Sequence, residues 1–137
     1  MENIFYQNII LIPAVTFVFS VILKGLIIKI SSNVWNLERA LWSGGMPSVH
    51  SSVVVSLATA FALKYGVSSD LFAIVMWFTV IIIYDAINVR YEAGLHAKMI
   101  NERLWEKKLK ESLGHLPSEA FAGSLLGLVV ALALFYV

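Results

Sequence analysis

Apolar residues gather in four long stretches of the chain, separated by short polar segments. A helix that spans a bilayer needs about 20 consecutive, mostly apolar residues. The pattern therefore predicts an all-α membrane bundle with four transmembrane helices, over residues 9–28, 46–63, 71–87 and 120–137. No Lys or Arg precedes the first stretch and no small-residue cleavage site follows it, so we do not expect a signal peptide.

One polar segment, residues 85–119, holds 12 of the 19 charged residues. Apolar side chains recur in it at roughly helical spacing, at Leu95, Met99, Ile100, Leu104 and Leu113. This pattern predicts an amphipathic helix on the membrane surface, with a solvated helix that packs on nothing as the alternative. Gly114 is expected to be the C-cap of this helix, and Pro117 to begin the last span.

Composition agrees with a single membrane-embedded domain over residues 1–137. Hydrophobic residues make up 59% of the chain and charged residues 14%, and the mean hydropathy is +0.81. Soluble domains have about 45–50% apolar and about 25% charged residues. These values exclude a disordered chain, a basic nucleic-acid binder and an ordinary soluble enzyme. The chain has no Cys and no Asp/Glu cluster, so we expect no disulfide, no metal and no cofactor.

The basic residues predict an orientation. With four spans, nine of the ten Lys and Arg residues lie at one face and only Lys64 lies at the other. Because basic loops stay in the cytoplasm, we expect both termini outside, in an inner or plasma membrane.

Small residues recur every four positions in two of the spans. They are Gly123, Gly127 and Ala131 in the last span, and Ser48, Ser52, Ser56 and Ala60 in the second. Such stripes let helices approach closely, within one bundle or across a dimer.

The first group of candidate functional residues lies at positions 44–52, Gly-Gly-Met-Pro-Ser-Val-His-Ser-Ser. Gly44 and Gly45 permit a tight turn, and Ser48 or Ser51 can cap the helix that follows. A glycine turn at a helix N-terminus directs several N–H groups at one anion. His50, in the first helical turn, could protonate the leaving oxygen of a phosphate ester. A merely capped helix with a hydrogen-bonded His is the equal alternative.

A second pair is His115 and Glu119, four residues apart. A carboxylate on one imidazole nitrogen fixes the tautomer and leaves the other nitrogen free to attack. The alternative is a helix-terminal His beside a Glu that favours the helix dipole.

Asp85, Asn88, Arg90 and Lys24 complete the candidates. An ionisable residue that ends an apolar run, as Asp85 does, is a functional candidate, and the Arg90 guanidinium suits phosphate oxygens. Asp85 and Arg90 are five positions apart and would not share a face of one helix, so we expect them to have different partners. Lys24 is expected to reach the interface as an anchor, with a contact to phosphate as the alternative.

Three motifs now occur in order: the 44–52 element, Asp-Ala-x-x-Val-Arg at 85–90 and Leu-Gly-His-x-Pro-x-Glu at 113–119. Together they resemble the divergent branch of the type-2 phosphatidic acid phosphatase family, which is related to vanadium-dependent haloperoxidases. The resemblance runs from Lys24 through the last span. It implies that His115 is the nucleophile, oriented by Glu119, and that His50 is the general acid. It also implies phosphate contacts from Ser48, Arg90 and Lys24.

The chain departs from the wider superfamily in several places. Val49 replaces a Gly and Glu119 replaces an Asp, and Leu109 stands where an Arg would precede His115. Arg90 and His96 have the superfamily's Arg-to-His spacing, but Ile100 occupies the position of the carboxylate, so we treat that match as coincidence.

The resemblance implies a membrane phosphatase that acts on a lipid phosphate or pyrophosphate through a phosphohistidine, without metal. A non-catalytic phospholipid-binding or lipid-transport protein that retains the phosphate pocket is the alternative. A structural subunit that binds other helices is a third reading. The expected partners are a lipid phosphate and membrane lipids, with no nucleic acid, and a homo-oligomer is left open.

Overall fold

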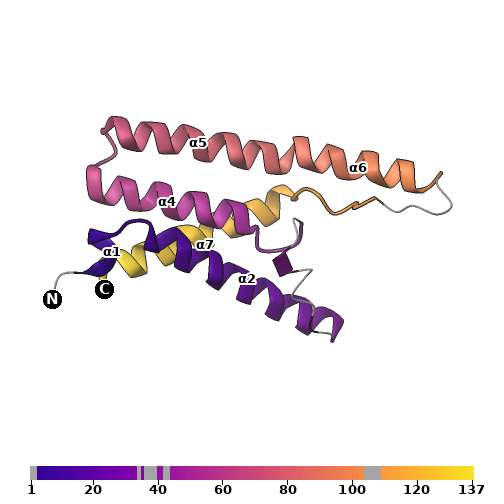
Figure 1. Ribbon diagram of the computed structural model, residues 1–137, viewed down its shortest axis with the longest axis horizontal. Helices are drawn as coiled ribbons and strands as arrows, with labels where there is room; N and C mark the ends of the chain where they lie inside the picture. The colour runs from indigo at the N-terminus through magenta and orange to yellow at the C-terminus, as the bar shows by residue number, and fades with distance from the viewer. Residues whose placement is uncertain (1–2, 34, 36–39, 42–43, 104–108) are drawn as a thin grey trace.

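The computed structural model describes residues 3–33, 35, 40–41, 44–103 and 109–137, and these form helices and no strands. The helices are α1 (Ile4–Gln7), α2 (Leu11–Ser32), α4 (Val49–Tyr65), α5 (Asp70–Ile87), α6 (Val89–Asn101) and α7 (Pro117–Tyr136). Helix α4 is the centre of the bundle, because α2, α5 and α7 all pack against it (Figure 1). The predicted all-α bundle is confirmed.

Each predicted span corresponds to one helix, with ends shifted by a few residues. Three segments are long and apolar enough to cross a membrane: α2, α7 and the continuous stretch Asp70–Asn101 that contains α5 and α6. Helix α4 is a shorter apolar helix of 17 residues. At 1.5 Å per residue it extends about 25 Å, slightly less than the hydrocarbon core of about 30 Å.

Helix α4 starts later than the hydropathy pattern predicts because a tight turn occupies its expected first residues. Gly44 and Gly45 have φ angles of 89° and 84°, which side-chain-bearing residues rarely adopt. Pro47 follows through a cis peptide bond and lies just before the cap. Ser48 is the N-cap, and its side-chain oxygen accepts from the Ser51 N–H at 3.3 Å.

The two stripes of small residues meet between α4 and α7. A Cβ atom at Gly123 would overlap the Ser48 carbonyl oxygen, and one at Gly127 would overlap that of Ser52. Further along the same contact, Ala60 and Ala131 are fully buried. The stripes thus serve helix packing within one bundle, as the four-residue spacing predicts.

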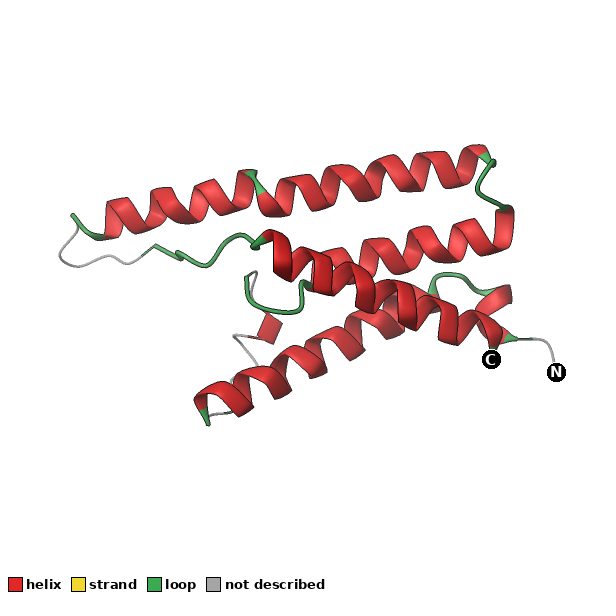
Figure 2. Ribbon diagram, turned by 180° about the vertical axis from the view of Figure 1, so that it is seen from behind, coloured by secondary structure: helices red, strands yellow, loops and turns green. Residues whose placement is uncertain are grey.

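Helices α5 and α6 form one long rod that passes the end of the bundle (Figures 1 and 2). The Thr79 hydroxyl joins α5 to α4 by donating to the Val54 carbonyl at 3.2 Å. The helical path is interrupted at Asn88, where φ is −114° and ψ is −75°. Beyond it, α6 is the predicted amphipathic helix, but it continues the line of α5 and does not turn across the end of the bundle (Figure 1).

Two details of the predicted amphipathic helix are wrong. Residues 109–116 are not helical, so Leu113 lies outside the helix and Gly114 is not its C-cap; Leu104 lies outside the described residues. The segment returns along α6, where the Asn101 side chain donates to the Leu109 carbonyl and accepts from its N–H, at 2.8 and 2.7 Å. Gly114 is required for close packing, because a Cβ there would overlap the backbone of Tyr91.

The chain termini lie together at the end of the bundle that is remote from the segment between α6 and α7 (Figure 1). The Asn3 amide donates to the last α7 carbonyls, those of Leu134 and Phe135, at 3.0 and 2.7 Å. Lys64, at the end of α4, donates to the Tyr6 carbonyl at 2.6 Å. These contacts close the end of the bundle at which the termini lie.

Substitution of Gly127 by Ala should destabilise the protein by about 1–3 kcal/mol, because the added methyl overpacks against the Ser52 backbone. Gly25→Ala is the matched control. Its added Cβ would meet only side-chain atoms at 3.7 and 3.8 Å, which is ordinary contact. Thermal unfolding in detergent should show a lower midpoint for the first variant only. Equal midpoints for the two variants would contradict the close α4–α7 contact.

Candidate active site

Two histidines from distant parts of the chain face one another at the end of the bundle away from the termini. The ring centroids of His50, on α4, and His115, just before α7, are 6.0 Å apart at an interplanar angle of 64°. Both rings line a cavity of about 300 Å³, together with Lys24 from α2. The structure thus brings together three of the residues that the motifs single out.

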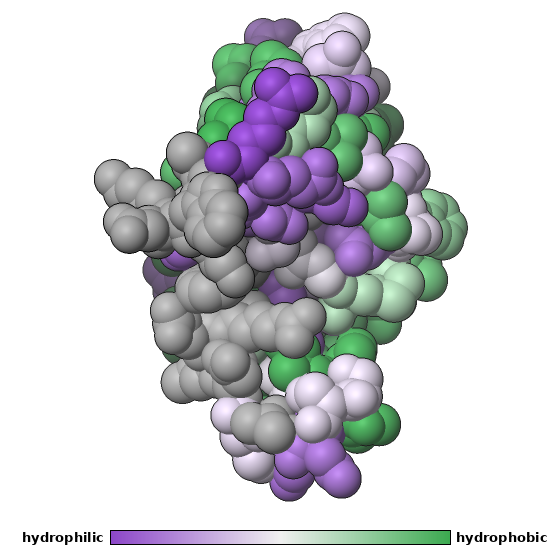
Figure 3. All heavy atoms as spheres, turned by 90° about the vertical axis from the view of Figure 1, so that its right-hand side faces the viewer, coloured by the Kyte–Doolittle hydropathy of each residue, from purple (hydrophilic) through white to green (hydrophobic). Residues whose placement is uncertain are grey.

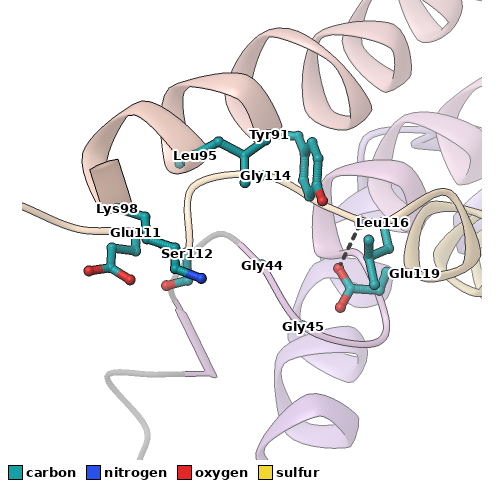
Figure 4. Close-up of a pocket in the computed structure, with 11 residues that line it drawn as sticks. Gly44, Gly45, Tyr91, Leu95, Lys98, Glu111, Ser112, Gly114, Leu116 and Glu119 are labelled. Carbon is teal, nitrogen blue, oxygen red and sulfur yellow. Dashed lines mark hydrogen bonds between the residues drawn. The ribbon is translucent and has the colours of Figure 1, made fainter. Parts of the chain in front are cut away.

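The position of His115 is fixed through both its backbone and its side chain. Its N–H donates to the Ala86 carbonyl near the end of α5, at 3.0 Å. Its Nδ1 lies 3.0 Å from Glu119 Oε2. The same carboxylate oxygen accepts from the Leu116 N–H at 3.1 Å (Figure 4). Because Pro117 begins α7, Glu119 lies in its first turn, where a carboxylate favours the helix dipole.

The other ring nitrogen of His115 has no hydrogen bond of ordinary geometry, although the Gly45 backbone is close enough to the imidazole to raise its pKa. The side chain is 1% exposed, and Nε2 has no hydrogen-bond partner within the described residues. The His115 ring belongs to the lining of the cavity, whereas Glu119 does not. With the proton held on Nδ1 by the carboxylate, Nε2 has a lone pair available for attack.

Burial lowers the pKa of His115 below the ordinary value of 6.5, and the hydrogen bond and charge of Glu119 oppose this shift. The imidazole is therefore neutral at pH 7, as a nucleophile requires.

Lys24 does not reach the interface as an anchor, so that expectation is wrong. Its side chain is 1% exposed and lies inside the bundle. Thr16, Ser20 and Lys24 share one face of α2, and the Ser20 and Ser52 hydroxyls are 2.7 Å apart where this face packs on α4. The Gly45 turn covers the lysine, since a Cβ there would lie 3.4 Å from Lys24 Cε. The ammonium is thereby held in the cavity wall beside both histidines.

Asp85 and Arg90 form an ion pair, which corrects the expectation that they face different partners. Arg90 Nε lies 2.6 Å from Asp85 Oδ2. A regular helix would separate residues five apart, but the interruption at Asn88 turns α6 enough to join them. The side chains are 47% and 40% exposed, and both act electrostatically on His50. The pair uses Nε, and no described residue accepts from the Nη groups of Arg90.

The remaining candidates lie around this centre and do not line its cavity. Ser48 is buried, and its hydroxyl accepts from the Ser51 hydroxyl at 3.0 Å, so both hydroxyls are used within the first turn of α4. Asn88 is exposed and donates back to the Tyr84 carbonyl at 3.2 Å. His96 is exposed on α6, away from the two facing rings. Among the described residues no group of three His, Asp or Glu side chains could hold a metal ion.

A second pocket is lined in part by Glu119 (Figure 4). Its volume is about 330 Å³, and Gly44 and Gly45 line it together with Tyr91, Lys98 and Ser112. Seen from this end of the molecule, hydrophilic side chains gather toward the α6 side and hydrophobic ones cover much of the flank (Figure 3). Glu119 therefore lines this second pocket, and it does not line the cavity that contains the histidines.

The sequence motifs do not include the apolar residues that line the histidine cavity. Its walls include Phe17 and Val21 on α2, Val53 and Val54 on α4, and Ile82 on α5. A signal for them exists in the spacing, because Val21 and Val53 lie three residues from Lys24 and His50 and therefore share their helix faces. Nothing in composition distinguishes these residues from others that face lipid.

Comparison with known proteins gives one relative and one family. A Bacillus subtilis (strain 168) protein described as the uncharacterized membrane protein YuiD is 40% identical, over 74% of this chain and 76% of the relative. No solved structure matches the chain. The sequence matches the family described as Divergent PAP2 over residues 5–130, which is nearly its whole length. The chain therefore belongs to the divergent PAP2 family of membrane proteins.

Proposed function

We propose that the protein is a membrane phosphatase that hydrolyses a lipid phosphate or pyrophosphate through a phosphohistidine on His115. The observation that carries this proposal is the buried Nε2 of His115, which has no hydrogen-bond partner among the described residues and belongs to a ring that lines a cavity with His50 and Lys24. An unsatisfied buried nitrogen costs about 1–3 kcal/mol. Such a cost is typical of functional sites, where the group is kept for a reaction.

In the first step, the Nε2 lone pair of His115 attacks phosphorus. The bond from phosphorus to the lipid oxygen breaks, and a proton from His50 is transferred to that oxygen. In the second step, His50 takes a proton from water, the water oxygen bonds to phosphorus, and the phosphorus–nitrogen bond breaks. Inorganic phosphate leaves, and both histidines return to their starting states.

The cations support this chemistry through electrostatics. Phosphoryl transfer depends mainly on positioning and on stabilising the charge of the equatorial oxygens. Lys24 supplies a buried positive charge in the cavity, and Arg90, whose Nη groups bond to no described residue, acts electrostatically on His50 from outside the cavity lining. Asp85 is then a positioning residue for Arg90 through the ion pair.

We further propose that this end faces the cytoplasm. Lys29, Arg90, Lys98 and Lys110 are among the nine basic residues predicted to lie at this face, whereas Lys64 donates a hydrogen bond at the end of the bundle where the termini lie. The positive-inside rule then favours both termini outside.

Replacement of His115 by Ala should reduce phosphate release from lipid phosphates by about a thousandfold or more, because no other group can form the intermediate. His96→Ala is the matched control, since His96 is exposed and lies outside the cavity. Release is measured with purified protein on phosphatidate and polyprenyl pyrophosphate. Full activity of the His115 variant would refute its role. Vanadate binding by a protein that releases no phosphate would support the binding or transport alternative.

The pH profile of kcat/KM, which reports the groups of the free enzyme, should have an acid limb below pH 6.5. The pKa of His115 lies below its ordinary value, so activity is lost only as the pH falls through that lowered pKa and Nε2 is protonated. Glu119→Gln removes the group that raises this pKa, so the limb should move to lower pH while kcat falls by about 10²-fold or more. Glu92→Gln, at an exposed position of α6, is the control and should change neither the position of the acid limb nor kcat. An acid limb above pH 6.5 would contradict the assignment.

Arg90→Ala should lower kcat/KM by about tenfold to a hundredfold, through loss of charge-assisted contacts to phosphate. Asp85→Asn should lower kcat/KM only a few-fold. The ion pair is nearly half exposed, and such pairs contribute about 0.2–1 kcal/mol. If Asp85 acts only through Arg90, the double variant should match Arg90→Ala alone. Additive losses would show an independent role for Asp85.

A further inference from the structure

The histidine cavity has one charged end and otherwise apolar walls. Lys24, beside the rings of His50 and His115, provides the charge at this end. The rest of the lining is aliphatic or aromatic and, apart from Leu41, comes from α2, α4 and α5, with Phe17, Val21, Val53 and Ile82 among its members. A site for a small water-soluble ester has no need of such walls, because only its phosphate would be bound.

The cavity is a groove with helical sides. Helices α2 and α5 both pack against α4, on different sides of it, but they do not pack against each other within the described residues (Figures 1 and 2). Helix α4 is therefore the floor, where Val54 is 8% exposed, and α2 and α5 are the walls. Phe17 is 45% exposed at the rim, so the groove opens sideways, toward lipid in a membrane.

The groove also has a direction and a length. Lys24, Val21 and Phe17 follow one face of α2 away from the charged end, toward the middle of the bundle. Seven residues of helix cover about 10 Å. At about 1.2 Å per bond of an extended chain, this length accommodates about eight carbons.

We infer that this groove binds the hydrocarbon chain next to the phosphate, and that the substrate enters sideways between α2 and α5. The inference rests on the proposed phosphatase function and names its substrate class, an amphipathic phosphate ester that reaches the site from the bilayer. Charge complementarity supports this occupant, since an anionic head meets Lys24 while its chain meets Val21, Val53 and Ile82. These three residues then determine chain specificity.

A second apolar groove provides a built-in control. It lies between α2 and α7, is lined by Leu23, Ile27, Leu125 and Leu126 among others, and contains no charged residue. It shares no lining residue with the histidine cavity. A bulky substitution there should leave the substrate groove unchanged.

The test uses a series of straight-chain monoalkyl phosphates from ethyl to dodecyl, with protein in lipid nanodiscs. For the wild type, kcat/KM should rise by up to about fourfold per methylene, the equivalent of 0.8 kcal/mol, and level off near eight carbons. Val53→Trp fills the groove and should reduce the octyl-to-ethyl ratio of kcat/KM toward one. Leu125→Trp, in the second groove, should preserve the ratio. Because partition into the nanodisc is the same for all proteins, the comparison isolates the groove.

A ratio that stays high in Val53→Trp, or a wild type without chain-length dependence, would overturn the inference while leaving the phosphatase intact. If no ester is hydrolysed by any protein, the proposed function itself fails. Ile82→Ala removes part of a wall and adds no bulk, so it should also lower the ratio. It replaces Val53→Trp if that variant does not fold.

Discussion

The close approach of α4 and α7 is the constraint on which the rest of the structure depends. Gly123 and Gly127 lie directly against the carbonyl oxygens of Ser48 and Ser52, where no side chain fits. At this separation the Ser48 N–H donates to the Glu119 carbonyl at 3.1 Å, which joins the first turns of the two helices. His50 and Glu119 are thereby brought to the same end of the bundle, although about half of the chain separates them in sequence.

The second requirement is that His115 be held without using its reactive nitrogen. Its backbone bonds to the end of α5, and its Nδ1 lies beside the first turn of α7. Three helices thus contribute to one imidazole: α5 through Ala86, α7 through Glu119 and α4 through the facing ring of His50. In a buried site with few competing waters, fixed charges and dipoles act more strongly on a phosphoryl group than they would in solvent. Preorganisation of this kind is what the proposed chemistry needs.

Much of this arrangement could be predicted from the sequence, because its signals are local. Apolar run lengths give the spans, four-residue spacing gives the α4–α7 contact, and the His115–Glu119 spacing gives their 3.0 Å contact. Features that depend on tertiary packing could not be predicted. Lys24 is buried because its face of α2 packs on α4, and Asp85 meets Arg90 only because the helix is interrupted at Asn88. Likewise, the chain groove consists of ordinary apolar residues that become a site only when α2 and α5 lie apart.

The most direct test of the account is to identify the covalent intermediate during turnover. Protein reacting with a lipid phosphate would be quenched in alkali, where phosphohistidine survives, digested, and mapped by mass spectrometry with ³¹P NMR to identify the ring nitrogen. The account predicts phosphate on Nε2 of His115, since Nδ1 is held by Glu119. Phosphate on Nδ1 or on another residue, or turnover without any phosphoenzyme, would contradict it.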